Sequence, residues 1–274
     1  MAPKLGVIGF GNIAKAIITP LLEKNVLQPE EIICLVNSKK SFENIKINYK
    51  YKINIYHLDS YESNLVWHCP IKLLAVKPQQ LKNIKEINFN ATNKYFLISI
   101  LAGVSLKTLE NIFPKHNCIR AVTNIPITIG QGLTGIAWNN DIDDKHKIFI
   151  KNIFENSGKV FELSEDYLDI FLALTSSAPA IIALIIDALG DGGLSGGLTK
   201  KLSEELVIDM IFGTVLMMKD LDLSPSELKN MVTSPAGTTI AALRILEKKG
   251  LRSALIESII GAMNKSKELS LIHI

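Results

Sequence analysis

Small residues, several with hydroxyl side chains, form a loop, TSPAGTT at 233–239, directly before a predicted helix over 239–249. The first turn of a helix has free backbone N–H groups and carries the positive end of the helix dipole, so it favours a carboxylate or a phosphate. We therefore expect this loop to bind the carboxylate of a small substrate. In a narrower interpretation, Thr238 or Thr239 only caps the helix.

A glycine motif at the start of the chain predicts a nucleotide site. An apolar strand predicted over 4–8 is followed by G-x-G-x-x-A at 9–14 and by an apolar-periodic helix that reaches about residue 24. In this context the first glycine makes a tight turn, the second lets the backbone approach a pyrophosphate, and the alanine permits close helix packing. The motif predicts cofactor contacts from Gly9, Phe10, Gly11, Asn12, Ile13 and Ala14. The alternative is a tight turn without a ligand.

The end of the second predicted strand, over 31–36, indicates which dinucleotide binds. A site selective for NAD normally has Asp or Glu here, which binds the ribose 2′-hydroxyl. This chain has Asn37, Ser38, Lys39 and Lys40 instead. An amide, a hydroxyl and two cations suit a 2′-phosphate, so we expect NADP(H), with NAD(H) as the second choice. Alternatively, the two lysines are ordinary loop residues.

Three further apolar strands end in residues that suit a crevice. They are predicted over 72–76, 95–100 and 118–122, and ligands of an open parallel sheet lie beyond the carboxyl ends of its strands. We therefore expect these strand ends to line the cofactor crevice, with Ala75, Val76, Lys77, Pro78, Ala102, Gly103 and Asn124. Pro78 and Gly103 also suit the turns that end strands in any protein.

A change of pattern at Ser164 predicts two domains. Residues 1–163 alternate strands and helices, although 41–60 show no clear pattern, whereas 164–274 are helical. We expect an α/β Rossmann domain over 1–163 and an all-α dimerisation and substrate domain over 164–274. The predicted helices are 165–174, 179–189, 199–221, 225–231, 239–249 and 251–269, and the glycines of 190–197 are expected to form the second connection.

Several predicted helices are apolar on more than one face, so they must be buried. A small helical domain cannot cover them all, and we expect a second subunit to do so. The most apolar stretch, over 170–186, has 17 residues and contains Pro179. A membrane span needs about 20 residues. We therefore expect a buried core helix here, and no membrane span.

The composition excludes several other classes of protein. The chain has 274 residues, 47% of them hydrophobic and 21% charged, and a net charge of +3, with scattered lysines. This is typical of a globular protein that does not bind nucleic acid. Three cysteines without a CxxC pair predict reduced thiols in the cytoplasm, and five histidines without ligand spacing give no support for a metal site. The N-terminus does not have the pattern of a signal peptide.

Taken together, these motifs resemble those of the pyrroline-5-carboxylate reductases, which reduce a cyclic imine to proline. The resemblance extends over about 4–270 and rests on VIGFGNIAKAI at 7–17, AVKP at 75–78, AGV at 102–104, RAVTNIP at 120–126, TSSAPA at 175–180 and VTSPAGTTIAAL at 232–243. It implies reduction of 1-pyrroline-5-carboxylate to L-proline with NAD(P)H, the last step of proline biosynthesis. It also implies a dimer that interleaves its helical domains, and decamers built from such dimers.

The resemblance also implies roles for residues. Ser234, Gly237, Thr238 and Thr239 would lie at the substrate carboxylate, with Ser177 nearby. Lys77-Pro78, Ala102-Gly103 and 124–126 would lie at the nicotinamide half of the cofactor. The chain departs from the family pattern where it has Ala178 and Ala236 in place of glycine, at Val122-Thr123, and at Ile125 in place of threonine. Alanine resists positive φ, so these loops either do not need it or bend differently.

A protonated imine is a strong electrophile, so its reduction depends mainly on position. Orientation against the nicotinamide supplies roughly 7–11 kcal/mol in well-aligned reactions. We expect Thr239 to bond the ring nitrogen or the carboxylate, and Ser234 to be the second catalytic residue. We also expect the carboxylate clamp, which is the loop over 233–239, and the nicotinamide to come from different subunits. One alternative is a reductase of another small keto or imino acid, although 178–189 lacks the lysine such enzymes use. The other is a nucleotide-binding protein without activity, suggested by the two alanines.

Overall fold

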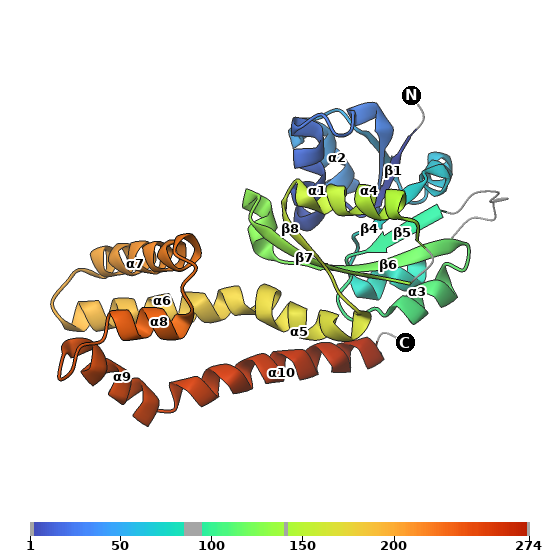
Figure 1. Ribbon diagram of the computed structural model, residues 1–274. Coiled ribbons are helices and arrows are strands. Elements are labelled where there is room, and N and C mark those ends of the chain that lie inside the picture. The colour runs from blue at the N-terminus through green and yellow to red at the C-terminus, as the bar shows by residue number, and fades with distance from the viewer. Residues whose placement is uncertain (1–2, 85–94, 140–141, 273–274) are drawn as a thin grey trace. The chain divides into compact units, whose positions relative to one another are not determined.

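The computed structural model describes residues 3–84, 95–139 and 142–272, and the chain folds into two compact units. One unit comprises Met1–Ser176 together with Ala262–Ile274, and the other is Ser177–Gly261. Figure 1 shows a sheet with helices on both faces in the first unit, and helices alone in the second. The predicted fold class, a Rossmann domain followed by a helical domain, is confirmed.

In the described part of the chain, the strands form one sheet in the order β3-β2-β1-β4-β5-β6-β7-β8. Neighbours run parallel except β6 and β7, which are antiparallel. The strands are β1 Leu5–Ile8, β2 Ile32–Val36, β3 Asn54–His57, β4 Ile71–Leu74, β5 Tyr95–Ser99, β6 His116–Thr123, β7 Gly132–Trp138 and β8 Gly158–Glu162. The first six have the Rossmann order, in which the order of successive strands reverses between β1 and β4.

Alternate residues of the strands build two separate cores. In β1, Val7 joins one hydrophobic cluster and Ile8 joins the other, and Cys34 and Leu35 of β2 divide in the same way. Side chains alternate between the two faces of a strand, so a sheet covered on both faces reads as a continuous apolar run. Helices α1 (Asn12–Glu23), α2 (Lys39–Asn48) and α4 (Asp144–Glu155) cover one face, and α3 (Leu106–Ile112) and α5 (Leu168–Leu172) cover the other.

Two stretches differ from the sequence predictions. Residues 41–60, which show no clear pattern, contain most of α2 and all of β3. The glycines expected to form a connection instead lie within α6 (Ala178–Ser195), up to Gly193. A side-chain Cβ at Gly193 would lie 2.6 Å from the Ser203 hydroxyl oxygen of α7 (Lys200–Asp220). Gly193, and to a lesser degree Gly190, therefore allow α6 and α7 to pack closely, whereas Gly196 and Gly197 follow the end of α6.

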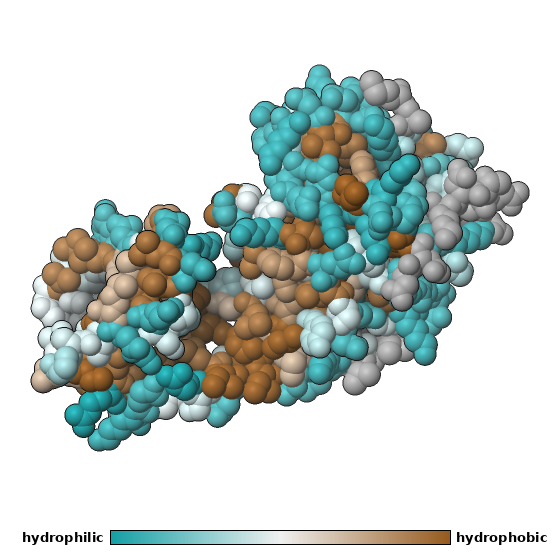
Figure 2. Space-filling view, in the orientation of Figure 1, coloured by the Kyte–Doolittle hydropathy of each residue, from teal (hydrophilic) through white to brown (hydrophobic). Residues whose placement is uncertain are grey.

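The helical unit leaves much of its apolar surface exposed. It contains α6, α7, α8 (Pro225–Met231), α9 (Thr238–Lys248) and the start of α10 (Leu251–Ile272). Leu184 of α6 is 67% exposed and Phe212 of α7 is 64% exposed. Figure 2 shows brown apolar side chains spread over this unit. The expectation of a buried core helix over 170–186 is therefore wrong for a single copy, because α6 has helical neighbours on too little of its surface.

The compact units divide the chain later than the change of pattern at Ser164. The division falls between Ser176 and Ser177, and the end of α10 also belongs to the unit of the sheet. Helix α5 packs on β6 and β7, and its Leu168 is fully buried there. The predicted domains over 1–163 and 164–274 follow secondary structure, whereas the compact units follow tertiary packing.

Candidate active site

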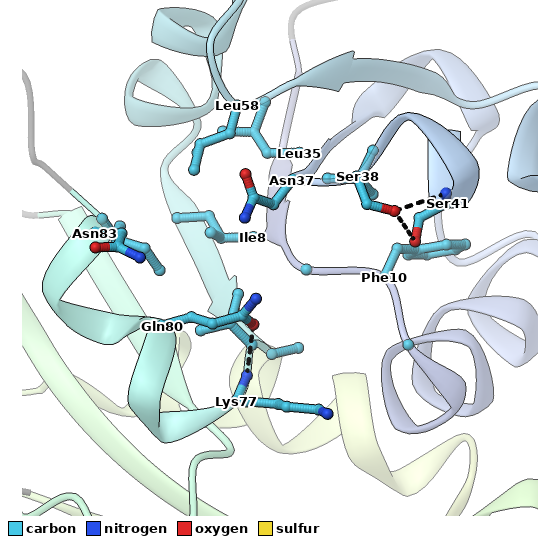
Figure 3. A pocket seen from close by; sticks show the side chains of 16 residues that line it. Ile8, Phe10, Leu35, Asn37, Ser38, Ser41, Leu58, Lys77, Gln80 and Asn83 are labelled. Carbon is cyan, nitrogen blue, oxygen red and sulfur yellow. Dashed lines mark hydrogen bonds between the residues drawn. The ribbon is translucent and has the colours of Figure 1, made fainter. Parts of the chain in front are cut away.

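A cavity of about 320 Å³ lies beyond the carboxyl ends of β1, β2 and β4, where the strand order reverses. Figure 3 shows polar side chains from two elements around it, with Asn37 and Ser38 after β2 and Gln80 and Asn83 after β4. Its apolar lining includes Ile8, Phe10, Leu35, Leu58 and Ile84. An apolar hollow with a few polar groups at this switch point is the usual dinucleotide site of the fold.

The two glycines of the first turn meet different demands. Gly9 has φ +91°, and a Cβ there would lie 2.6 Å from the carbonyl oxygen of Ala75, so the fold itself requires glycine. Gly11 has no protein atom within 4 Å of the place where a Cβ would lie. It is also the N-cap of α1, and no side chain caps this helix. Open space beside an uncapped helix N-terminus fits the close approach of a pyrophosphate.

The rest of the motif lies in the first turn of α1. Asn12 is exposed and Ile13 is half-buried. Neither these two residues nor Ala14 lines the cavity. Ala14 is buried against the core, which agrees with its predicted role in helix packing. Contacts from Asn12 and Ile13 are therefore expected from their backbone N–H groups at the helix start.

The start of α2 forms a hydroxyl pair at the end of β2. The Ser38 oxygen accepts the Ser41 backbone N–H at 3.0 Å and its hydroxyl donates to the Ser41 side chain at 3.0 Å. Asn37, Ser38 and Ser41 line the cavity, whereas Lys39 is exposed and lines a neighbouring hollow with Phe42 and His57. The sequence reasoning missed Ser41. Two serines three residues apart at a helix start were the signal for it.

Residues after β4 close another side of the cavity. Ala75, Val76 and Lys77 line it as predicted, and Pro78 begins the turn of 3₁₀ helix Pro78–Asn83. The Lys77 backbone N–H donates to Gln80 Oε1 at 3.2 Å, which fixes the glutamine against the turn. Gln80 and Asn83 were not predicted, because nothing in their spacing shows which way a 3₁₀ turn faces.

The predicted residues after β5 and β6 lie outside this cavity and take part in packing. Gly103 has φ +71°, and a Cβ there would lie 3.2 Å from the backbone of Leu269 in α10. Asn124 is only 5% exposed; its side chain donates to the carbonyl oxygen of Thr175 at 3.1 Å and accepts the backbone N–H of Leu133 at 2.8 Å. Ala102 is exposed. Their place at the nicotinamide half stays a prediction.

The hydroxyl-bearing loop enters α9 without a side-chain cap. Helix α9 begins at Thr238, its N-cap is Gly237, and no side chain caps it. The alternative in which Thr238 or Thr239 serves as the N-cap is therefore wrong. The Gly237 backbone N–H donates to the Ser234 carbonyl oxygen at 3.2 Å, and a Cβ on Gly237 would lie 2.5 Å from the Ser234 hydroxyl oxygen. The loop thus leaves the helix N-terminus open to an anion.

The two alanines that replace glycine have different backbone conformations. Ala236 has φ +57°, in the left-handed region that favours glycine, so this loop does need positive φ. A non-glycine residue there costs roughly 1–2 kcal/mol. Ala178 is the first residue of α6 and is helical. Only the alanine in the proposed clamp is strained.

Ser177 does not join the loop within one copy of the helical unit. It immediately precedes α6, whose 18 residues span roughly 27 Å. Figure 1 shows the connection between α8 and α9 near the other end of α6. Both belong to the unit Ser177–Gly261, so one copy separates the two predicted parts of the substrate site.

Comparisons with known proteins agree with this architecture. Residues 4–103 match the family model "NADP oxidoreductase coenzyme F420-dependent", and residues 165–269 match "Pyrroline-5-carboxylate reductase dimerisation". The chain is 37% identical to the pyrroline-5-carboxylate reductase of Synechocystis, over 98% of this chain and 99% of that one. The chain belongs to the pyrroline-5-carboxylate reductase family. The resemblance predicted from the motifs is confirmed.

Solved structures of pyrroline-5-carboxylate reductases share the whole fold. The Coxiella burnetii structure is 30% identical, with a TM-score of 0.84 and coverage of 98% and 99% of the two chains. The Plasmodium falciparum structure, which has NADP bound, is 28% identical, with a TM-score of 0.81 and coverage of 98% of each chain. The family membership therefore rests on sequence and on structure over nearly all of the chain.

Proposed function

We propose that the protein reduces 1-pyrroline-5-carboxylate to L-proline by hydride transfer from NADPH, as the last step of proline biosynthesis. The observation that carries this function is the cavity at the β1–β4 switch point, with open space at Gly11 beside an uncapped helix. Full-length identity to pyrroline-5-carboxylate reductases supports the same substrate.

The residues of the cavity fit NADPH well. The turn of Gly9 and Gly11 and the start of α1 hold the pyrophosphate. Asn37, Ser38 and Ser41 offer hydrogen bonds to a 2′-phosphate, and Lys39 adds positive charge from the first turn of α2. The end of β2 carries no Asp or Glu that would select NAD. When bound, NADPH supplies the hydride from C4 of its nicotinamide ring.

In this proposal, the chain contributes position more than acid–base chemistry. The open N-terminus of α9 and the hydroxyls of Ser234 and Thr238 bind the ring carboxylate. Thr239, half-buried in the first turn of α9, bonds the ring nitrogen or the carboxylate and fixes the imine carbon. Orientation of this kind lowers barriers by roughly 7–11 kcal/mol.

We further propose that two subunits build one active site. Ser177 and the clamp loop lie near opposite ends of α6 in one copy, so a partner can supply one of them. The match to a dimerisation domain and the exposed apolar side chains of α6 and α7 support a homodimer through the helical unit. Assembly of these dimers into decamers is the corresponding proposal for the complete enzyme.

We propose a cytoplasmic enzyme that does not enter a membrane or bind nucleic acid. By length and composition alone, the helical run Glu165–Ser195 could cross a membrane. This run lies entirely within the dimerisation match, over 165–269, so its apolar surface suits a partner subunit. Cys34 and Cys69 are buried thiols, as expected in a reducing compartment.

The test is NADPH oxidation at 340 nm with 1-pyrroline-5-carboxylate. We expect turnover, and a higher kcat/KM with NADPH than with NADH. NADPH binding without turnover, under conditions in which a known enzyme of the family works, would favour a nucleotide-binding protein without activity. A preference for NADH would contradict the interpretation of residues 37–41 and leave the imine reduction intact.

A further inference from the structure

An ion cluster around the buried side chain of Arg120 links strand β6 to helices α3, α5 and α10 of the sheet-containing unit. Arg120 of β6 is only 3% exposed, and its Nη1 and Nη2 lie 3.2 Å from Glu165 Oε1 and Asp169 Oδ1, respectively. Glu165 Oε1 also accepts the Leu106 backbone N–H, at the first residue of α3, at 2.7 Å. Asp169 Oδ1 also accepts the Ser266 hydroxyl of α10 at 2.8 Å.

Asp169 therefore bonds to both segments through which the chain enters and leaves the helical unit. Asp169 itself lies in α5, about two helical turns before the chain leaves this compact unit after Ser176. Ser266 lies about one turn after the chain returns at Ala262. One carboxylate joins the outgoing helix, the returning helix and the central arginine.

Other contacts hold the same two segments to the ends of β5 and β6. The Ser176 hydroxyl donates to the Thr123 carbonyl oxygen at 3.1 Å, and Asn124 holds Thr175. On the returning side, Leu269 packs against Gly103 after β5. A shift of either segment would therefore move residues at the ends of β5 and β6.

We infer that Asp169 is a positioning residue for hydride transfer. By fixing both connections to the helical unit, it sets how that unit presents the clamp loop of 233–239. It does not line the cavity at β1–β4, so the contacts proposed there for the pyrophosphate and the 2′-phosphate do not depend on it. This inference rests on the proposed function. A misplacement of about 1 Å can lower a rate about 100-fold, which makes such an anchor important for catalysis.

The test compares Asp169→Ala with Asp166→Ala, a control at an exposed acid in the 3₁₀ turn just before α5. For Asp169→Ala we expect kcat to fall about 10- to 100-fold, with NADPH affinity and dimer formation unchanged. The isotope effect on kcat, measured with NADPH deuterated at the transferred position, should rise because misalignment makes hydride transfer rate-limiting. If Asp169 only stabilised the fold, its replacement would reduce the fraction of enzyme molecules that are active and leave KM and the isotope effect unchanged.

Ser266→Ala keeps the inference testable if Asp169→Ala does not fold. It removes only the bond to α10, and we expect a decrease in kcat of about threefold with a raised isotope effect. Wild-type kcat and isotope effects in the variants that fold would overturn the inference, as would a loss of kcat without a change in isotope effect.

Hydrogen exchange separates this inference from the proposed function, because it needs no substrate. In Asp169→Ala, we expect faster exchange in 173–177 and in 262–270 than in the wild type and in Asp166→Ala. If the wild type shows no turnover but the variant exchanges faster at both segments, the proposed reaction is wrong, whereas the role of Asp169 in holding both segments is supported. Unchanged exchange at both segments would overturn the anchor.

Discussion

The sheet-containing unit and the helical unit bury their apolar residues to different degrees. In the first, neighbouring residues of each central strand supply two cores, and side chains such as Val7 and Leu35 are almost fully buried. In the second, Leu184 and Phe212 are mostly exposed although their helices are regular. A sheet covered by helices on both faces completes its core within one chain, whereas a few helices side by side cannot.

This difference shows where each unit obtains its stability. The unit of the sheet should fold on its own contacts and respond to changes inside its core. The helical unit should depend on a second copy and therefore on protein concentration.

Phe212→Asp should have the largest effect, because it places a charge on apolar surface that we assign to the dimer. We expect the dimer to lose about 4 kcal/mol, which is about 1,000-fold in its dissociation constant. Analytical ultracentrifugation should show monomers, and activity should be lost with them. Ile47→Asp, at a 73% exposed residue of α2, is the matched control and should stay dimeric. An active Phe212→Asp dimer would contradict the proposed interface.

Gly9→Ala should destabilise the sheet-containing unit by about 3 kcal/mol, because of positive φ and of contact with Ala75. Urea unfolding measures this loss. Gly11→Ala is the matched variant, since its Cβ meets open space. It should keep wild-type stability and bind NADPH at least tenfold more weakly. Equal losses of stability in both variants would contradict the interpretation that Gly11 is needed for the ligand and not for the fold.

The sheet-containing unit should become less stable as the pH is lowered, because of His116 in β6. Burial, with the charges of Lys72 and Lys115, lowers the pKa of His116 from 6.5 to about 3. Between these values the unfolded chain binds a proton that the folded chain does not, so stability falls as pH drops from 6.5 and the loss is complete near pH 3. Linkage gives about 2 kcal/mol between pH 7 and pH 5.

Urea unfolding at pH 7 and pH 5 measures this dependence. His116→Gln should remove most of it, whereas His57→Gln, at the edge strand β3, should retain it. If His116→Gln keeps the full dependence, other groups cause it. The helical unit contains no histidine, since none occurs over 177–261, so its own unfolding should change less over this pH range.

Ala236→Gly should have the smallest effect and acts in the helical unit. Relief of positive φ should stabilise the loop by roughly 1 kcal/mol, partly offset by about 0.5 kcal/mol of extra chain entropy. Thermal unfolding of the dimer should therefore shift slightly upward, and KM for the imine should change because the loop becomes more flexible. Ala178→Gly, in a helix, should shift unfolding downward. Shifts of the same sign would contradict the strained conformation of Ala236.

Local patterns were sufficient for much of the fold and for part of the site. The glycine turn at 9–14, the strand ends at Asn37 and Lys77 and the order of helices after Ser164 were all predicted. These features depend on period-two burial, on turn residues and on helix caps, which act over a few residues. Residues 41–60 were not assigned, because α2 is mostly exposed and β3 is an edge strand, and neither has a clear apolar period.

The remaining features needed contacts between distant residues. Ser41, Gln80 and Asn83 enter the cavity only because two turns face each other across the sheet edge. Gly190 and Gly193 look like loop residues, yet they allow α7 to approach α6. In the Arg120 cluster, residues that bond directly are 45 to 97 positions apart, so no local pattern indicates it.

Short stretches of residue type and spacing were enough to predict the class of fold, the nucleotide motif and the family. The tertiary structure decided which of those residues meet. It showed that the loop before α9 is open and uncapped, that Ala236 has positive φ, and that Ser177 lies apart from that loop. It also joined α5 and α10 to the sheet through Asp169, because a buried guanidinium must be surrounded by carboxylates from wherever the fold brings them.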